Sequence, residues 1–419
     1  MAEYVAPRGT SDVLPGETAK WEYVEARFRE ACALYAYREI RTPTFENTEL
    51  FTRNLGETTD VVSKEMYTFT DRGGRSLTLR PEMTAGAIRA YVQHNLGAGL
   101  PVTKIYYIGR LYRYERPQAG RYREHTQLGV EAIGSDDASL DAEIIALAVQ
   151  FYRSVGLTEF ELGLNSIGCP LCRPRYREAL VQYAASKLDR LCPSCLQRYE
   201  HNPMRMLDCK APECRAALAD APRMVDYLGD ECAGHFAQVQ RYLRDLGIPF
   251  SVDQKLVRGF DYYTRTVFEF VSGELGAQNA VGGGGRFDNL VEELGGQPTP
   301  AVGFGLGLER LMITLDALGV ELPVISGLTA FVAVMGGAAR EAGVKLLWNL
   351  RNTGIRADMD YTGRSLKAQM KLADRLESRF VVILGDEEIS AGSATVRDMR
   401  SSEQTTVPLG ELVEFLQRA

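Results

Sequence analysis

The stretch KIYYIGRLYRYERPQAGRYREHTQLGVEAIG, residues 104–134, decides how this sequence is interpreted. Two runs rich in aromatic and β-branched residues, 104–115 and 125–134, flank the polar segment ERPQAGRYRE. This pattern predicts two antiparallel strands joined by a polar loop. Residues 110–123 contain five arginines and one glutamate but no lysine. A charge run is usually a solvated face, but arginine grips phosphate oxygens in pairs, so this composition favours a phosphate-binding hairpin.

The chain is long enough for more than one domain. Its 419 residues exceed what one hydrophobic core usually holds. Residues 169–249 are helical and rich in cysteine, without strand runs, and have the character of an insertion. After a linker-like segment, strands and helices alternate over residues 328–419, which predicts a small α/β domain. The expected domains are therefore 1–325, which includes the insertion, and 328–419.

Several elements of the first domain are predicted locally. Residues 17–38 carry apolar side chains at helical spacing, and residues 76–80 alternate as a strand. A helix is expected to follow Pro81, because a proline near a helix start loses no needed N–H donor. Residues 256–270, LVRGFDYYTRTVFEF, are expected to form a strand pair with an Arg-Gly turn. Residues 303–311, GFGLGLERL, begin as a glycine-rich strand and end as a helix.

Composition and charge exclude several classes of protein. Hydrophobic residues make up 45% and charged residues 25%, as in ordinary globular proteins. A net charge of −7 and a pI of about 5.4 exclude a generally basic nucleic-acid binder, although a local basic surface is compatible with them. The sequence offers neither a membrane-spanning run nor a signal peptide at its start. A cytoplasmic location without a membrane partner is expected.

Two pairs of cysteines have the spacing of a zinc site. The pairs CPLC and CPSC are nineteen residues apart, and an x2 spacing presents both sulfurs to one tetrahedral ion. The expected ligands of a structural zinc ion are Cys169, Cys172, Cys192 and Cys195. Cys209 and Cys214 offer a competing set with the second pair, and buried free thiols are the simpler alternative. A reducing compartment argues against disulfides.

Several separated segments together resemble the class II aminoacyl-tRNA synthetases. The arginine-tipped hairpin and residues 303–311 resemble motifs 2 and 3 of that class. RGFDYYTRTVFE (258–269) and GGGGRFDNLVEELGG (282–296) resemble two signatures of the histidyl-tRNA synthetases. Pro43 resembles the motif 1 proline of the dimer interface. The resemblance runs over nearly the whole chain, from APRGTSD at residues 6–12 to the C-terminal domain.

The resemblance implies a fold and an activity. The fold is an α+β catalytic domain built on an antiparallel sheet, with a helical insertion and a C-terminal α/β anticodon-binding domain. The activity is that of a histidine–tRNA ligase, a homodimer that uses ATP with Mg²⁺ to make histidyl-adenylate. It then transfers histidine to the 3′ end of histidine tRNA.

The resemblance also implies an ATP site. A carboxylate attacks the α-phosphate of ATP, so fixed cations aimed at the developing negative charge are the main catalytic resource. Arg113 and Arg310 are expected at the α-phosphate and adenine side. Arg121 is expected at the terminal phosphates and Glu115 at the adenine or the metal-bearing face. Arg258 is expected on the opposite side of the α-phosphate. The expected catalytic residues are Arg258, Arg113 and Arg310.

A histidine site follows from the same resemblance. Glu82 and Thr84 are expected to bind the α-amino group, and Gln127 the carboxylate. Glu131 and Tyr263 are expected to bind the two imidazole nitrogens. Such a site rejects a close analogue strongly, because its buried polar atoms would be left unpaired.

Four further positions complete these expectations. Phe287 stands where a tyrosine is common in the family, which removes a hydroxyl there. His125 is interpreted as structural, so that no enzyme histidine acts as general base. Arg116 and Gln118, at the hairpin tip, are expected to meet the acceptor end, where histidine tRNA carries an extra 5′ guanine.

Two other functions share part of this pattern. A regulatory paralogue that binds histidine and serves ATP phosphoribosyltransferase typically lacks the C-terminal domain and the arginine at position 258. Other class II synthetases, such as the threonyl and prolyl enzymes, lack RGFDYYTRTVFE. The C-terminal domain, Arg258 and RGFDYYTRTVFE are all present in this chain. The enzyme is therefore the favoured interpretation.

Overall fold

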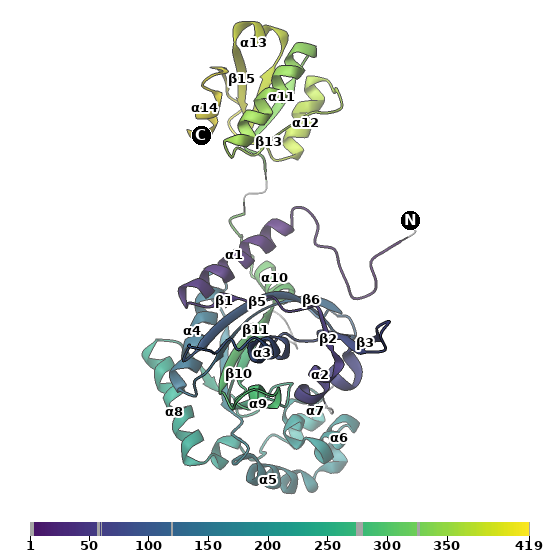
Figure 1. Cartoon of the computed structure of the whole chain (residues 1–419), viewed down its shortest axis with the longest axis vertical. Helices are drawn as coiled ribbons and strands as arrows, with labels where there is room; N and C mark the ends of the chain where they lie inside the picture. The colour runs from purple at the N-terminus through teal and green to yellow at the C-terminus, as the bar shows by residue number, and fades with distance from the viewer. Residues whose placement is uncertain are drawn as a thin grey trace. The chain divides into compact units, whose positions relative to one another are not determined.

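A computed structural model describes residues 4–56, 59, 61–118, 120–273, 280–324 and 327–418. The chain divides into two compact units, Met1–Pro323 and Val324–Ala419 (Figure 1). Within the described ranges, every helix is too short or too polar to span a lipid bilayer.

An eight-stranded sheet forms the centre of the first unit (Figure 1). In spatial order its strands are β1 (Arg38–Glu39), β5 (Thr103–Tyr112), β6 (Glu124–Ile133), β11 (Ala301–Gly307), β10 (Ala280–Arg286), β9 (Thr264–Val271), β7 (Glu161–Ser166) and β8 (Ser251–Val252). Neighbours run antiparallel except at the two edges, where β1 with β5 and β7 with β8 are parallel. The expected antiparallel sheet is confirmed, and its hairpin is β5–β6.

Helices cover one face of this sheet. The main core joins the sheet to α1 (Thr18–Leu34), α4 (Ala138–Ser154), α8 (Asp230–Asp245) and α10 (Leu308–Ala317). Val302, Phe304 and Leu306 of β11 are buried in this core. Because successive side chains of a strand point to opposite faces, the glycines between them face the other surface. That surface carries the candidate site.

A second core lies on this other side. It contains residues of α3 (Thr84–Gln93), α9 (Leu290–Glu293) and α2 (Thr48–Leu55) together with the loop 256–263. A three-stranded sheet adjoins them, in the order β2 (Phe45–Asn47), β4 (Ser76–Leu79), β3 (Tyr67–Thr70), and a helical turn at Val61–Glu65 precedes β3.

The insertion is helical, as expected. Residues 169–249 are all described, and they contain no strand. Before α8 they form α5 (Arg173–Ala185), α6 (Pro193–His201) and α7 (Pro212–Ala217), with short 3₁₀ segments η2 (Leu188–Arg190), η3 (Pro203–Asp208) and η4 (Met224–Tyr227). Helices α5 to α7 gather at one end of the first unit, at the bottom of Figure 1.

The strand pair expected over residues 256–270 is wrong. Strand β9 begins at Thr264, and Leu256–Tyr263 form a loop. Both hydrogen-bonding edges of β9 are already paired, one with β10 and the other with β7. No edge therefore remains for a preceding strand, and the loop instead buries Leu256, Tyr262 and Tyr263 in the second core.

The C-terminal unit has a five-stranded sheet of its own. Its order is β13 (Ala357–Met359), β12 (Ala330–Val334), β14 (Phe380–Leu384), β15 (Ser393–Asp398), β16 (Gln404–Pro408). The first three strands are parallel, and β15–β16 is an antiparallel hairpin that the sequence analysis missed. The helices are α11 (Gly337–Asn352), α12 (Leu366–Arg375), α13 (Asp386–Ala391) and α14 (Leu412–Arg418).

Candidate active site

Glycines at alternate positions of β11 leave space for other side chains on the open face of the main sheet. A Cβ atom added to Gly303 would lie 1.7 Å from the carboxylate of Glu131, and one added to Gly305 would lie 2.2 Å from Nε2 of Gln127. Both distances are far below van der Waals contact, so a side chain at either position would displace Glu131 or Gln127. The glycines of GFGLGLERL therefore make room for two of the expected histidine-binding side chains.

The neighbouring strand β10 repeats this arrangement. A Cβ atom on Gly283 would lie 2.8 Å from Nη1 of Arg258, and one on Gly285 would lie 3.1 Å from the ring of Tyr263. The glycine cluster 282–285 thus leaves space for two further expected residues, Arg258 and Tyr263.

A cavity of about 250 Å³ opens on this face. Four arginines from three separate segments line it: Arg113 and Arg121 of the β5–β6 hairpin, Arg258 and Arg310. These are the arginines expected at ATP, and Glu115 and Gln127 line the same cavity. The structure therefore brings together residues that lie up to 197 positions apart in the sequence.

Two of these arginines are each held by one short hydrogen bond and by longer contacts, which Arg113 makes with Glu115 at 3.8 Å and Arg258 makes with the Tyr263 ring at 5.7 Å. Nε of Arg113 donates a hydrogen bond to the carbonyl oxygen of Pro81 at 2.7 Å. Nη1 of Arg258 donates to Oε2 of Glu269 at 3.0 Å, while Nε of Arg258 is buried without a partner among the described residues. Each guanidinium keeps donors in reserve for an anion.

Arg310 lies at the start of α10, where the glycine-rich strand ends. It donates to the carbonyl oxygens of Ala280 at 2.9 Å and Gly120 at 3.1 Å. Burial lowers the pKa of Arg310, and the neighbouring Arg121 lowers it further. Nε of Arg121 lies 3.4 Å from the Glu115 carboxylate. Cations that repel one another in this way favour a polyanionic ligand.

One histidine and two glutamates of the cavity lining had no ligand-binding role expected from the sequence. Burial, with Arg113 and Arg310 nearby, lowers the pKa of His125 to about 3, so this imidazole is neutral at pH 7. Glu269 and Glu309 also line the cavity. Their signal lay within the motifs, since Glu269 ends RGFDYYTRTVFE and Glu309 directly precedes Arg310.

Glu309 connects α10 to the arginine-tipped hairpin by a hydrogen bond. Its carboxylate accepts a hydrogen bond from the Thr126 N–H at 2.7 Å. Burial raises the pKa of Glu309 to about 7.

Three of the five expected histidine-binding residues, Glu82, Thr84 and Glu131, form a buried polar network with Tyr107. Oε1 of Glu131 accepts hydrogen bonds from the Thr84 hydroxyl at 2.8 Å and the Tyr107 hydroxyl at 2.9 Å. The Glu82 carboxylate accepts from the N–H groups of Thr84 and Ala85 at 2.7 and 2.8 Å, at the start of α3. Burial raises the pKa of Glu131 to about 8. Its Oε2 is buried and has no hydrogen-bond partner in the described part of the chain.

Aromatic rings form the wall between this network and the arginines. Tyr263 is buried, and the guanidinium carbon of Arg258 lies 5.7 Å from its ring centroid. Phe287 is 1% exposed and packs edge-to-face against Tyr262 at 5.7 Å. The apolar ring of Phe287 therefore fills a packed position that needs no hydroxyl.

The residues expected at the tRNA acceptor end lie apart from the cavity lining. Arg116 and Gln118 are exposed in the loop of the hairpin. Gln118 and Arg121 exchange two backbone hydrogen bonds, of 2.9 and 3.2 Å. This small bridge links an exposed tip residue directly to an arginine of the cavity.

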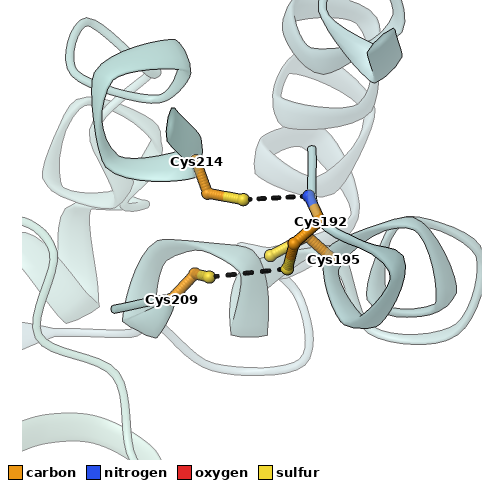
Figure 2. A group of neighbouring side chains, drawn as sticks. All are labelled: Cys192, Cys195, Cys209 and Cys214. Atoms are coloured by element: carbon orange, nitrogen blue, oxygen red, sulfur yellow. Dashed lines mark hydrogen bonds between the residues drawn. The ribbon is translucent and has the colours of Figure 1, made fainter. Parts of the chain in front are cut away.

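The expected pairing of the cysteines is wrong. Cys192 and Cys195 gather with Cys209 and Cys214, the competing set, with all four sulfurs within 4.8 Å of one another (Figure 2). Cys169 and Cys172 gather instead with Cys232. The reason is the spacer: α5 has 13 residues and is about 20 Å long, so it carries the second pair away from the first.

The antiparallel sheet, the arginine-lined cavity and the glycine-rich junction of β11 with α10 define the catalytic domain of a class II aminoacyl-tRNA synthetase. The profile of the histidyl-tRNA synthetase family matches residues 9–311, and that of an anticodon-binding domain matches residues 329–419. The histidine–tRNA ligase of Desulforamulus reducens is 52% identical over 410 residues, which cover 98% of each chain.

Solved structures agree with these matches. Apo histidyl-tRNA synthetase from S. aureus superposes with a TM-score of 0.84 at 40% identity, covering 99% of this chain and all of that one. The chain belongs to the histidyl-tRNA synthetase family. A Bacillus halodurans structure described as an ATP phosphoribosyltransferase regulatory subunit/histidyl-tRNA synthetase has a TM-score of 0.67 at 23% identity, which shows a shared fold alone. The regulatory alternative is not favoured.

Proposed function

We propose that the arginine-lined cavity holds ATP and that the network around Glu131 holds histidine, so that histidyl-adenylate forms between them. One observation carries this proposal: four arginines from three segments line one cavity beside a buried carboxylate that has an oxygen without a hydrogen-bond partner among the described residues. The histidine carboxylate attacks the α-phosphorus, the bond to the bridging oxygen breaks, and pyrophosphate leaves. A hydroxyl of the terminal tRNA ribose then attacks the carbonyl carbon, and AMP leaves.

The four arginines bind different parts of ATP. Arg113 and Arg310 bind the α-phosphate and adenine side, and Arg121 binds the terminal phosphates. Arg258 approaches the α-phosphate from the loop side, where its unpartnered Nε supplies a donor as charge develops in the transition state. Fixed cations of this kind need no reorganisation when the reaction occurs.

Glu115 has an acceptor to spare. Its Oε2 is buried without a hydrogen bond in the described residues, although Arg121 lies near it. This oxygen fits the amino group of adenine or a hydrated Mg²⁺ ion that accompanies ATP. When bound, Mg²⁺ would neutralise part of the phosphate charge.

The histidine side chain is recognised by its two ring nitrogens. Glu131 offers its unpartnered Oε2 to one nitrogen, and the Tyr263 hydroxyl binds the other. Glu82 and Thr84 bind the α-amino group at the start of α3. Gln127, whose Oε1 is also buried without a partner in the described chain, holds the substrate carboxylate at the edge of the cavity through its amide N–H.

ATP–pyrophosphate exchange with each amino acid in turn tests the proposed function. We expect exchange with histidine only, because a site built on hydrogen bonds to both ring nitrogens leaves its own groups unpaired with any other side chain. Exchange with threonine or proline, or histidine binding without any exchange, would instead support one of the alternative functions.

The titration of Glu131 gives a pH-dependent prediction. A carboxyl group whose pKa is raised by folding, here to about 8, stabilises the fold fully below its unfolded pKa, and this contribution is lost as the pH rises through about 8. Without ligand, the wild type should therefore lose stability relative to Glu131→Gln between about pH 5 and pH 8. The loss should reach at most about 1.4 kcal/mol per pH unit.

Thermal unfolding of both proteins at several pH values measures this difference. Other buried groups such as Glu309 cancel in the comparison, because both proteins contain them. A difference in stability that stays constant from pH 5 to pH 8 contradicts the raised pKa of Glu131.

Two features of the assembled enzyme are also proposed. A homodimer fits the surface near Pro43, where the rings of Phe45 and Phe69 are 50% and 43% exposed and lie 6.2 Å apart. Exposed apolar groups of this kind are typical of a protein interface. A cytoplasmic location fits an enzyme that needs ATP, histidine and tRNA together.

A further inference from the structure

Seven of the eight cysteines lie in two clusters of the insertion. The larger cluster contains four sulfurs from three short segments (Figure 2). Cys192 precedes α6 and Cys195 lies in its first turn, Cys209 follows η3, and Cys214 lies in α7. Three chain segments therefore converge on one point.

The spacing of these sulfurs fits a single tetrahedral ion. Sulfurs about 2.3 Å from a zinc ion, at the corners of a tetrahedron, lie about 3.8 Å from one another. The Sγ atoms of Cys192 and Cys209 are 3.8 Å apart, and all four sulfurs lie within 4.8 Å of one another. A disulfide would require about 2.0 Å, and all four cysteines are free. The Cys192 N–H also donates to Sγ of Cys214 at 3.1 Å, the kind of contact that stabilises a thiolate ligand.

The surrounding elements are short. Helices α6 and α7 have 9 and 6 residues and η3 has 6, lengths at which a helix has little stability of its own. An ion that joins them would supply the missing cohesion, as structural zinc sites do. The smaller cluster offers three sulfurs, and no fourth cysteine, histidine or carboxylate joins it among the described residues. The four-cysteine cluster is therefore the stronger candidate.

The segment between Cys195 and Cys209 touches the catalytic loop. Nδ2 of Asn202 donates to Oδ1 of Asp261 at 2.8 Å, and Nη1 of Arg205 donates to the carbonyl oxygen of Gly259 at 2.9 Å. Both acceptors lie within three residues of Arg258. The cysteine cluster therefore fixes both ends of the segment 196–208. This segment in turn contacts the loop that carries Arg258.

We propose that Cys192, Cys195, Cys209 and Cys214 bind one zinc ion, and that this ion positions residues 202–205 against the loop that carries Arg258. Cys192 and Cys195 flank one end of this segment and Cys209 the other, so the ion closes a loop around it. Asn202 and Arg205 are positioning residues, which act through the loop. The second half of the proposal rests on the function proposed above for Arg258, and the first half does not.

Metal analysis of the purified full-length protein tests the site. We expect about one zinc per chain, as in other four-thiolate sites. Cys209→Ser should lose this zinc, whereas Cys32→Ser, at a buried cysteine outside both clusters, and Cys232→Ser, in the smaller cluster, should retain it. Iron in place of zinc, eight titratable thiols without metal, or a loss of zinc on Cys232→Ser would overturn the assignment.

Hydrogen–deuterium exchange tests the connection to the loop. In Cys209→Ser, peptides covering residues 202–205 and 256–263 should exchange about tenfold faster, the effect expected when a hydrogen bond is lost. Peptides of β5 and β6, in the main sheet of the same unit, should be unchanged, which excludes general unfolding of that unit. Unchanged exchange at residues 256–263 in a zinc-free variant would overturn the proposed positioning.

The variant Asn202→Ala tests the positioning of the Arg258 loop without removing a zinc ligand. This variant should keep its zinc, yet lower kcat for pyrophosphate exchange about tenfold with little change in the KM for histidine. The conservative variant Asn202→Asp loses the donor to Asp261 and should behave in the same way. Normal kcat in both variants would overturn the positioning role. Absent exchange in the wild type would instead contradict the proposed function and leave the zinc measurement standing.

Discussion

Replacing Arg258 by histidine is expected to lower ATP–pyrophosphate exchange by on the order of a hundredfold or more, the loss seen when one fixed donor to a developing oxyanion is removed. Arg258 pairs with Glu269 at 3.0 Å through one nitrogen only, and its Nε has no partner in the described chain. The donor is therefore present before substrate arrives. A shorter, largely neutral imidazole at pH 7 supplies neither the reach nor the charge.

Histidine binding should remain measurable in this variant, because the network around Glu131 does not depend on the guanidinium. Calorimetric titration with histidine beside pyrophosphate exchange separates the two effects. Arg110→His is the matched control: Arg110 is half-exposed, pairs with Glu124 at 2.8 Å and lies outside the cavity lining. Near-normal exchange in Arg258→His would remove Arg258 from the mechanism.

The central sheet shows what a sequence can predict. Strands β5 and β6 were expected from two runs rich in aromatic and β-branched residues, and their pairing followed from the polar loop between them. The gathering of Arg113, Arg258 and Arg310 was expected only through resemblance to a family. Nothing in the local sequence states that β11 lies beside β6, an arrangement fixed by the buried face of the sheet.

The errors have a common physical cause. An x2 spacing determines which two cysteines share a turn, but the path of α5 determines which pairs meet. In the same way, residues 256–263 have strand-like composition, yet both edges of β9 are occupied by β10 and β7. Tyr107 was not predicted as a partner of Glu131, because the two residues lie on different strands, β5 and β6. Each error depends on long-range packing that no local pattern records.

Truncation after Gly327 is expected to separate activation from transfer. Among the described residues, the hydrophobic clusters of the first unit contain none beyond Leu322, and those of the second contain none before Leu328. Each unit therefore has its own core, so a protein of residues 1–327 should fold and keep its histidine-dependent pyrophosphate exchange. All residues proposed to bind ATP and histidine are retained.

Transfer of histidine to tRNA should fall far more than activation in this truncated protein, because the anticodon-binding domain is absent and single-stranded loops are where RNA sequence is read. Gln118→Ala in the full-length chain gives the complementary result. Its exposed side chain lies at the hairpin tip, so transfer should fall for tRNA bearing the extra 5′ guanine but not for tRNA lacking it. Aminoacylation kinetics with both tRNAs, alongside circular dichroism of each variant, measure these effects. A folded truncated protein that charges tRNA as fast as the whole chain would show that the C-terminal unit does not read RNA.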